Sequence, residues 1–193
     1  MSGIEFHKES ASADRLAAPL GNSETFDYGD PVGLLDEQLS DTSSAANAEL
    51  TILEIIGFAL EPAEGIHAAS RTGATNGFGA TENADRTYVP FDAAGLYLRT
   101  RNYWADGASG TDVAKNGALI GTLHGMIASS AGVYGLEVPV PTGGTDAEFL
   151  VVEVLDNDGI RINADATQTA GDGWLVFRPV KQLLSQLTEG GVT

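Results

Sequence analysis

The alternation of apolar and polar positions is clearest between residues 148 and 167. Residues 149–155 are rich in β-branched and aromatic side chains, which favour a strand. The sequence Asp-Asn-Asp-Gly follows at 156–159, and an Asp-Gly pair between apolar runs indicates a hairpin turn. Apolar and polar residues then alternate over 160–165, as in a strand with one wet face. A third apolar run, at 173–180, is near enough to pair with this hairpin, so a β-sheet core is predicted here.

Three further segments have strand-like patterns. Residues 96–104 alternate, with Leu96, Leu98, Thr100, Asn102 and Trp104 on the same face. Residues 133–140 predict a strand at a sheet edge, because Pro139 cannot donate a ladder hydrogen bond. Residues 24–28 fit a short edge strand that carries Phe26 and Tyr28 on one face.

Two apolar segments fit either a strand or a helix. Residues 49–60 would place Leu53, Ile56 and Leu60 on one helical stripe, but their length and β-branching favour a strand. Residues 117–128 also fit a helical stripe. Their three interior glycines would cost a helix about 1 kcal/mol each, so a buried strand is preferred there.

The two ends of the chain differ from the middle. Residues 1–23 are small and polar, which predicts a flexible N-terminal tail. Residues 24–193 are predicted to form a single β-rich domain, and the spacing of apolar residues over 180–187 predicts a short amphipathic helix near its end. The Gly, Thr and Asn-rich segment 71–86 reads as a long surface loop and does not match a phosphate-binding glycine pattern.

Charge limits the classes of partner. The chain of 193 residues has 27 acidic and 10 basic residues, for a net charge of −17. Nucleic acids and anionic membranes attract basic surfaces, so neither is an expected partner. There is no cysteine, no apolar run long enough for a transmembrane helix, and no signal-peptide pattern at the N-terminus. We therefore expect synthesis in the cytoplasm without export by the general secretory route.

No residue pattern predicts a catalytic, cofactor or metal site. His7, His67 and His124 are far apart and lack metal-ligand spacing, and no nucleophile-elbow motif occurs. The 156–159 sequence resembles the start of a calcium loop, but Thr167 stands where such a loop needs Glu. The chain is accordingly expected not to be an enzyme and to need no cofactor, although two of its many carboxylates could still meet as an acid–base pair.

One stripe of basic and aromatic residues stands out. It consists of Tyr97, Arg99, Arg101 and Tyr103 on the predicted strand. Such a stripe could stack on nucleic-acid bases. In so acidic a chain it is better explained by pairing with neighbouring carboxylates or with the acidic surface of a partner.

Several segments together resemble the head decoration, or capsid cement, proteins of tailed bacteriophages, in the broad lambda-like sense. They are the small polar N-terminal segment, the Asn-Gly-Ala-Leu-Ile-Gly-Thr-Leu sequence at 116–123, and the apolar runs at 149–159 and 174–178. The likeness extends over residues 24–60 and 116–180. The chain is longer than the small lambda-like members, and the 71–86 loop has no counterpart.

This resemblance implies a mainly β fold, compact and β-sandwich or β-barrel-like (β-tulip-like). It also implies a virion protein that binds the outer surface of the capsid as a homotrimer at three-fold positions and stabilises the expanded head. The partner would be the major capsid protein, joined by strand addition from the N-terminal tail. The apolar residues expected to make that contact are Leu16, Leu20, Phe26 and Tyr28.

The alternative is a β-rich surface or tail-associated module that binds carbohydrate. Tyr97, Tyr103 and Trp104 would then form an aromatic platform for the sugar.

Overall fold

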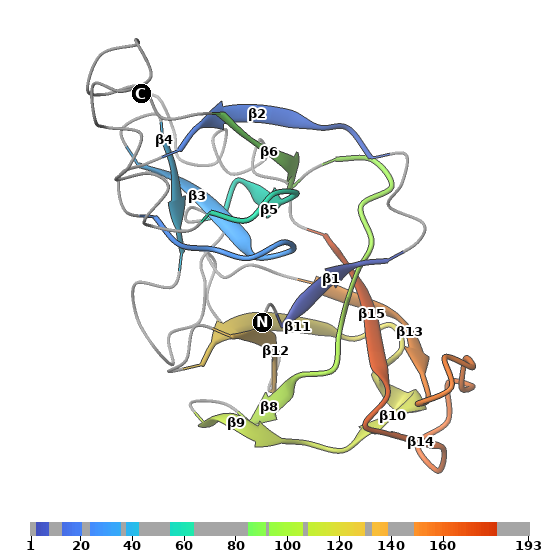
Figure 1. Cartoon of the computed structure of the whole chain (residues 1–193). Helices are drawn as coiled ribbons and strands as arrows, with labels where there is room; N and C mark the ends of the chain where they lie inside the picture. Colours follow the sequence, from blue (N-terminus) through green and yellow to red (C-terminus); the bar gives the residue numbers. More distant parts are fainter. Residues whose placement is uncertain are drawn as a thin grey trace, which may run out of the picture.

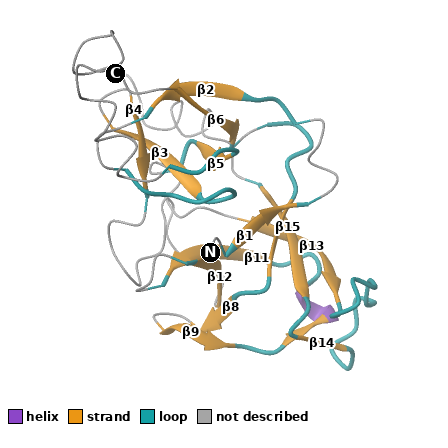
Figure 2. Cartoon of the chain, in the orientation of Figure 1, coloured by secondary structure: helices purple, strands orange, loops and turns teal. Residues whose placement is uncertain are grey.

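The computed structural model describes residues 3–7, 13–20, 24–35, 38–42, 55–63, 85–91, 93–105, 108–129, 133–138 and 149–180. Within these residues the fold is mainly β, with sheets of eight, five and two strands (Figures 1 and 2). The two larger sheets pack on one another, which confirms the expected β-sandwich-like architecture. The C-terminal helix expected over 180–187 and most of the 71–86 loop lie outside the described residues.

The eight-stranded sheet has the order β1-β7-β15-β13-β11-β12-β8-β9. The bounds of its strands are β1 Ile4–Phe6, β7 Leu98–Thr100, β8 Tyr103–Ala105, β9 Ala108–Asp112, β11 Leu123–Ala128, β12 Tyr134–Val138, β13 Phe149–Leu155 and β15 Trp174–Pro179. All described pairs in it are antiparallel except β12 with β8, which is parallel.

The remaining strands form two smaller sheets. The five-stranded sheet has the order β2-β6-β5-β3-β4, with β2 Leu16–Pro19, β3 Pro31–Leu35, β4 Gln38–Asp41, β5 Gly57–Ala59 and β6 Asp85–Pro90. The two-stranded sheet pairs β10, Lys115–Asn116, with β14, Thr169–Gly171. A short 3-10 helix, η3 Gly117–Leu119, follows β10.

The strand predicted over 96–104 is broken into two. β7 ends at Thr100 and β8 starts at Tyr103, so only Arg101 and Asn102 separate them. Those two residues change the alternation, because Leu98 and Thr100 are buried on one side of the break and Tyr103 and Trp104 are both buried on the other.

This break requires the eight-stranded sheet to curl. β7 and β8 are the second and seventh strands in its order, which would place them about 24 Å apart in a flat sheet. The link between them can reach only about 10 Å. The sheet therefore curves until its two sides meet at Asn102, whose side-chain amide donates to the Tyr134 carbonyl at 2.9 Å.

Glycine at position 135 is a requirement of this closure. A Cβ atom there would lie 2.7 Å from the Asn102 Cβ and 3.0 Å from the Trp104 ring. The Asn102 carbonyl accepts from the Leu136 N–H at 3.1 Å at the same place. Only a residue without a side chain lets β8 and β12 approach closely enough for this contact.

The five-stranded sheet also closes on itself at one point. Leu20, directly after β2, forms a parallel bridge with Leu39 of β4. These two strands are the outermost in the order of the sheet. Inside the curve lies a small core of buried residues, which are Leu20, Phe26, Val32, Leu39, Ala59, Ala63 and Tyr88.

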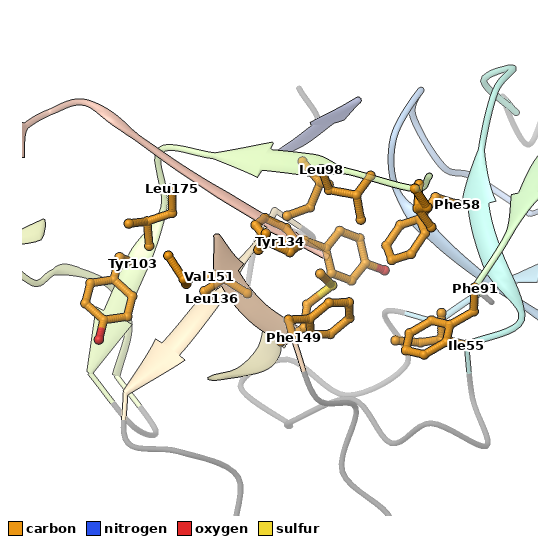
Figure 3. Packing of buried hydrophobic residues seen from close by; sticks show 14 of the residues in the cluster. Ile55, Phe58, Phe91, Leu98, Tyr103, Tyr134, Leu136, Phe149, Val151 and Leu175 are labelled. Carbon is orange, nitrogen blue, oxygen red and sulfur yellow. The ribbon is translucent and has the colours of Figure 1, made fainter. Parts of the chain in front are cut away.

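Aromatic side chains join the two sheets. Phe149 of β13 packs edge-on against Phe58 of β5 at 6.3 Å and against Phe91 at 5.7 Å (Figure 3). It also packs edge-on against Phe177 of β15 at 5.5 Å. All four rings are at most 2% exposed. Phe149 therefore belongs at once to the core of the curled sheet and to the interface with the other sheet.

A buried polar contact crosses the same interface. The Tyr134 hydroxyl of β12 donates to the Asp41 carboxylate of β4 at 3.0 Å and lies 3.1 Å from the Thr42 hydroxyl. Burial raises the pKa of Tyr134, so its hydroxyl stays protonated. A hydroxyl has directional partners, which fixes how the two sheets are oriented.

The structure differs from the flexible N-terminal tail expected over 1–23. Within this segment, β1 pairs with β7 and β2 pairs with β6, and Ile4 is 0% exposed. The segment is polar overall, but its few apolar residues stand where they can complete each core. Composition alone could not show this.

The strands predicted in the C-terminal half have different outcomes. The strands predicted over 149–155 and 173–180 are confirmed as β13 and β15, which pair with each other. The strand predicted over 160–165 is limited to a bridge from Arg161 to Leu155. In segment 117–128 the preferred strand is β11, preceded by η3. β12 lies inside the sheet and not at an edge, since it ends at Val138, before the prolines.

In segment 49–60 the described part, 55–60, contains the strand β5, as the preferred strand interpretation expected, and residues 49–54 lie outside the described residues. In segment 24–28 only Phe26 forms a bridge, to Ala63.

The aromatic interface predicts a large loss of stability on truncation. Phe149→Ala is expected to lower the free energy of unfolding by about 3–5 kcal/mol, since it leaves a cavity that three rings cannot fill. Urea denaturation measures this. The control Val180→Ala truncates a side chain that is 36% exposed and should change stability by less than about 0.5 kcal/mol. Equal effects of the two substitutions would contradict the role given to Phe149.

Candidate functional site

The four residues expected to bind a partner divide into two pairs. Leu16 is 51% exposed and Tyr28 is 47% exposed. Leu20 and Phe26 are buried, at 1% and 3%. The apolar pattern predicted that all four side chains need covering, and for Leu20 and Phe26 the protein's own small core covers them.

Leu16 lies on β2, most of whose residues are exposed to solvent. β2 pairs with β6 from Leu16 to Pro19, and among the described residues its other edge is joined only where Leu20 meets Leu39. Leu16, Ala17 and Pro19 are exposed. A strand in this situation offers unpaired backbone groups to another chain.

Tyr28 is held on a tight turn. The Asp30 carboxylate accepts a hydrogen bond from the Asp27 N–H at 2.7 Å. The Tyr28 ring packs edge-on against Phe6 at 5.2 Å. With Leu34 of β3, which is 50% exposed, Leu16 and Tyr28 are the exposed large apolar residues of the five-stranded sheet and its turns in the described part. We call Leu16, Tyr28 and Leu34 the apolar anchors.

The two arginines of the basic and aromatic stripe lie against Trp174, a residue that the sequence pattern did not include. The guanidinium groups of Arg99 and Arg101 lie 4.3 and 4.4 Å from the ring centre of Trp174 on β15. Arg99 is also paired with Glu5 of β1 at 2.7 Å. The cross-strand partner of Arg99 is Val176, two residues from Trp174, but this pairing cannot be read from spacing alone.

The aromatic platform of the carbohydrate alternative does not form on the surface. Tyr103 and Trp104 are 3% and 4% exposed. The break at Arg101 and Asn102 turns Tyr103 into the core instead of leaving it beside Tyr97. Burial raises the pKa of Tyr103 to about 12. A stacking surface for sugars needs open ring faces, which these two side chains lack.

Lys115 of β10 is a buried lysine whose charge interacts with that of Arg101. It is 3% exposed, and burial is the main cause that lowers the pKa of its ammonium group. Charge interactions with Asp112 and Asp172 raise that pKa, while the nearby Arg101 lowers it. Arg101, Lys115, Asp112 and Asp172 therefore form one charge cluster at one end of the curled sheet.

His124 of β11 is buried, and both of its ring nitrogens have hydrogen-bond partners. Its Nδ1 atom lies 3.0 Å from the Glu137 carbonyl, so Nδ1 carries the proton, and its Nε2 atom lies 2.7 Å from the Thr122 hydroxyl. The ring packs edge-on against Tyr103 at 5.3 Å. Burial lowers the pKa of His124, against the smaller opposite effect of the Glu137 hydrogen bond. This histidine has a structural place in the core.

The 156–159 segment is a self-capped turn. One Asp156 carboxylate oxygen accepts from the N–H groups of Asp158 at 3.0 Å and Ile160 at 2.8 Å. Gly159 has a φ of +77°, which favours glycine. One oxygen of the Asp156 carboxylate is thus engaged by the backbone of the turn, in agreement with the turn interpretation.

In the described part of the chain, no group of three His, Asp or Glu residues is placed to hold a metal ion. Nor does any helix of that part have the length and apolar character to span a membrane.

Comparisons with known protein families, with characterised proteins and with solved structures find no match to this chain.

The environment of His124 predicts how stability depends on pH. An unfolded histidine has a pKa near ~6.5. Because the folded pKa is lower, the unfolded chain takes up a proton first as pH falls below that value. The free energy of unfolding should therefore decrease as pH falls from ~6.5 to the folded pKa, and this contribution then levels off.

His124→Asn keeps a donor for the Glu137 carbonyl but cannot titrate. Urea unfolding at about pH 7.5 and pH 5 measures the change for both proteins. The variant should lose less stability between the two pH values than the parent. Carboxylates contribute equally to both proteins, so an identical loss would show that His124 does not cause the dependence.

The turn geometry predicts no dependence on divalent cations. Removal of such ions with a chelator should leave the melting temperature unchanged, because the Asp156 carboxylate is satisfied by backbone N–H groups. Thermal unfolding with chelator, and with added calcium as the control, checks this. A decrease on chelation that calcium reverses would show that the turn binds the ion.

Proposed function

We propose that this chain is a non-enzymatic structural protein of a tailed bacteriophage that decorates the outside of the capsid. In this role it binds the major capsid lattice as a homotrimer and stabilises the expanded head. It is made in the host cytoplasm and ends on the outer surface of the virion. The domain that does this is of the β-tulip-like kind that the sequence resemblance implies.

The edge of β2 opposite β6 carries the proposal, since among the described residues it is joined only by the bridge from Leu20 to Leu39. Leu16, Ala17 and Pro19 are exposed, and the strand uses one edge for β6. A strand or loop of the capsid protein can add to the other edge by main-chain hydrogen bonds. The apolar anchors, Leu16, Tyr28 and Leu34, then lose water on the same sheet and add to the binding free energy.

The mode of strand addition differs from the one expected from sequence. A free tail would reach out to the capsid and pay the ordering cost on binding. Here β1 and β2 are already ordered in the fold. The partner strand therefore meets a preformed edge, which lowers the entropic cost of association.

Two further features support the decoration role. Three of the segments that resemble decoration proteins lie close together, since 116–123 runs into β11 of the eight-stranded sheet and the two later runs form the paired strands β13 and β15 of the same sheet. The net charge of −17 would keep decorated particles apart in solution. Binding at three points would also give a trimer avidity without chemistry.

The first test is association with particles. Virus-sized particles from the source are separated on a density gradient, and the polypeptide is quantified against the major capsid band by mass spectrometry. About one copy per capsid subunit, or one trimer per three-fold position, is the expected ratio. A few copies per particle would indicate a tail or fibre protein, and absence from particles would refute the proposal.

The second test addresses the β2 edge. Leu16→Asp should weaken binding to expanded heads that lack the protein by at least about tenfold, because a carboxylate replaces an apolar anchor. Stability should change little, since Leu16 is 51% exposed. Co-sedimentation measures binding, and Val180→Asp, at a site 36% exposed beyond β15, is the matched control. Equal binding by the two variants would remove β2 from the contact.

A further inference from the structure

The guanidinium of Arg101 is held in an exposed position in which it can bind a carboxylate. Arg101 is exposed, its guanidinium lies 4.4 Å from the Trp174 ring centre, and it donates to the Asp172 carbonyl at 3.3 Å. Stacking on an aromatic ring fixes the plane of a guanidinium and leaves its N–H edge open for a bidentate partner.

No carboxylate of the described residues pairs with Arg101. By contrast, Arg99 pairs with Glu5 and Arg161 pairs with Glu153. Arg178 also lacks a carboxylate partner in the described residues, but Arg101 differs from it because its guanidinium is held over an aromatic ring. The nearby Asp112 and Asp172 carboxylates interact with buried Lys115. These two carboxylates are therefore engaged with Lys115 and do not form an ion pair with Arg101 among the described residues.

The 156–160 turn is the complementary feature. Asp156 caps its backbone, which leaves Asp158 and Ile160 at the surface of a turn whose shape is fixed. Asp158 is exposed and Ile160 is 63% exposed, the largest exposure among the exposed large apolar residues of the described part. The turn thus presents a carboxylate beside an apolar side chain, which suits an arginine beside an indole ring.

Both features lie at the same end of the curled sheet. Leu155, the last residue of β13, is the cross-strand partner of Trp174, the first residue of β15. The turn continues from Leu155, and Arg101 contacts Trp174. A three-fold axis near this end would bring the turn of one copy to Arg101 of the next.

We propose that the 156–160 turn of one copy docks on Arg101 and Trp174 of a second copy, with Asp158 paired to Arg101 and Ile160 packed on the exposed part of the indole. This inference rests on the proposed homotrimer and assigns its contact. The contact is heterologous, because unlike patches meet, and repetition around an axis closes a ring.

Electrostatics favours this contact over others between identical copies. Each copy carries a net charge of −17, so most pairs of surfaces repel. A two-fold contact centred on Arg101 would place it near its own counterpart. A contact between Arg101 and the acidic turn brings opposite charges together, and it gives subunit association a dependence on salt.

The test compares oligomeric state by sedimentation velocity over a range of protein concentrations. The parent protein should form trimers that dissociate as sodium chloride is raised. Arg101→Glu and Asp158→Arg should each weaken trimer formation by at least about tenfold. The double variant R101E/D158R should restore it, because the pair is kept with its charges exchanged.

Arg178→Glu is the matched control, since it makes the same charge change at an exposed site on the other end of β15. It should leave the trimer largely intact, and circular dichroism should show that all variants remain folded. Three results would each overturn the inference: a parent protein that stays monomeric, equal effects of R101E and R178E, or no restoration in the double variant.

Capsid binding by the same variants separates this inference from the proposed function. A parent protein that binds capsids but fails the oligomer tests would leave the decoration role standing without this contact. A parent protein that forms the salt-sensitive trimer but binds no capsid would support this contact and refute the decoration role.

Discussion

The bend at Arg101 and Asn102 determines both how the larger sheet closes and where its basic surface lies. One run of chain supplies β7 on one side of the sheet and β8 on the other, so the sheet has to curl. Asn102 binds across the join to Tyr134 and Leu136. The same bend leaves Arg101 outside on Trp174 and sends Tyr103 into the core. A strand without this bend could do neither.

The closed sheet is joined to its neighbour by contacts of two different kinds. Phe149 supplies apolar area from the inside of the curl to Phe58 and Phe91. Apolar contact of this kind stabilises but has little directionality. Tyr134 adds a hydrogen bond to Asp41 that is satisfied in one relative orientation of the sheets. The aromatic cluster therefore holds the two sheets together, and the Tyr134 hydrogen bond fixes their relative orientation.

Sequence patterns predicted the sheet-forming segments well where they contained long alternating or β-branched runs. β13 and β15 are examples, since each is decided by its own residues and by a nearby partner. Prediction failed where long-range pairing decides the outcome. The N-terminal segment reads as polar, yet Ile4 fills a core formed by residues almost a hundred positions later. For the same reason Leu20 and Phe26 looked like partner-binding residues.

The candidate sites also depend on long-range strand pairing, which sequence patterns could not predict. The pattern found Arg99 and Arg101 but not Trp174, because a cross-strand neighbour has no fixed spacing in sequence. Net charge, however, could be read directly and constrains what such a site does. In a chain of charge −17, an arginine stacked on tryptophan with no carboxylate partner in the described residues differs from a structural ion pair such as Arg99 with Glu5. Arg99 already has a carboxylate partner within the chain, whereas the exposed guanidinium of Arg101 can exchange the water on its remaining N–H groups for a carboxylate of another molecule.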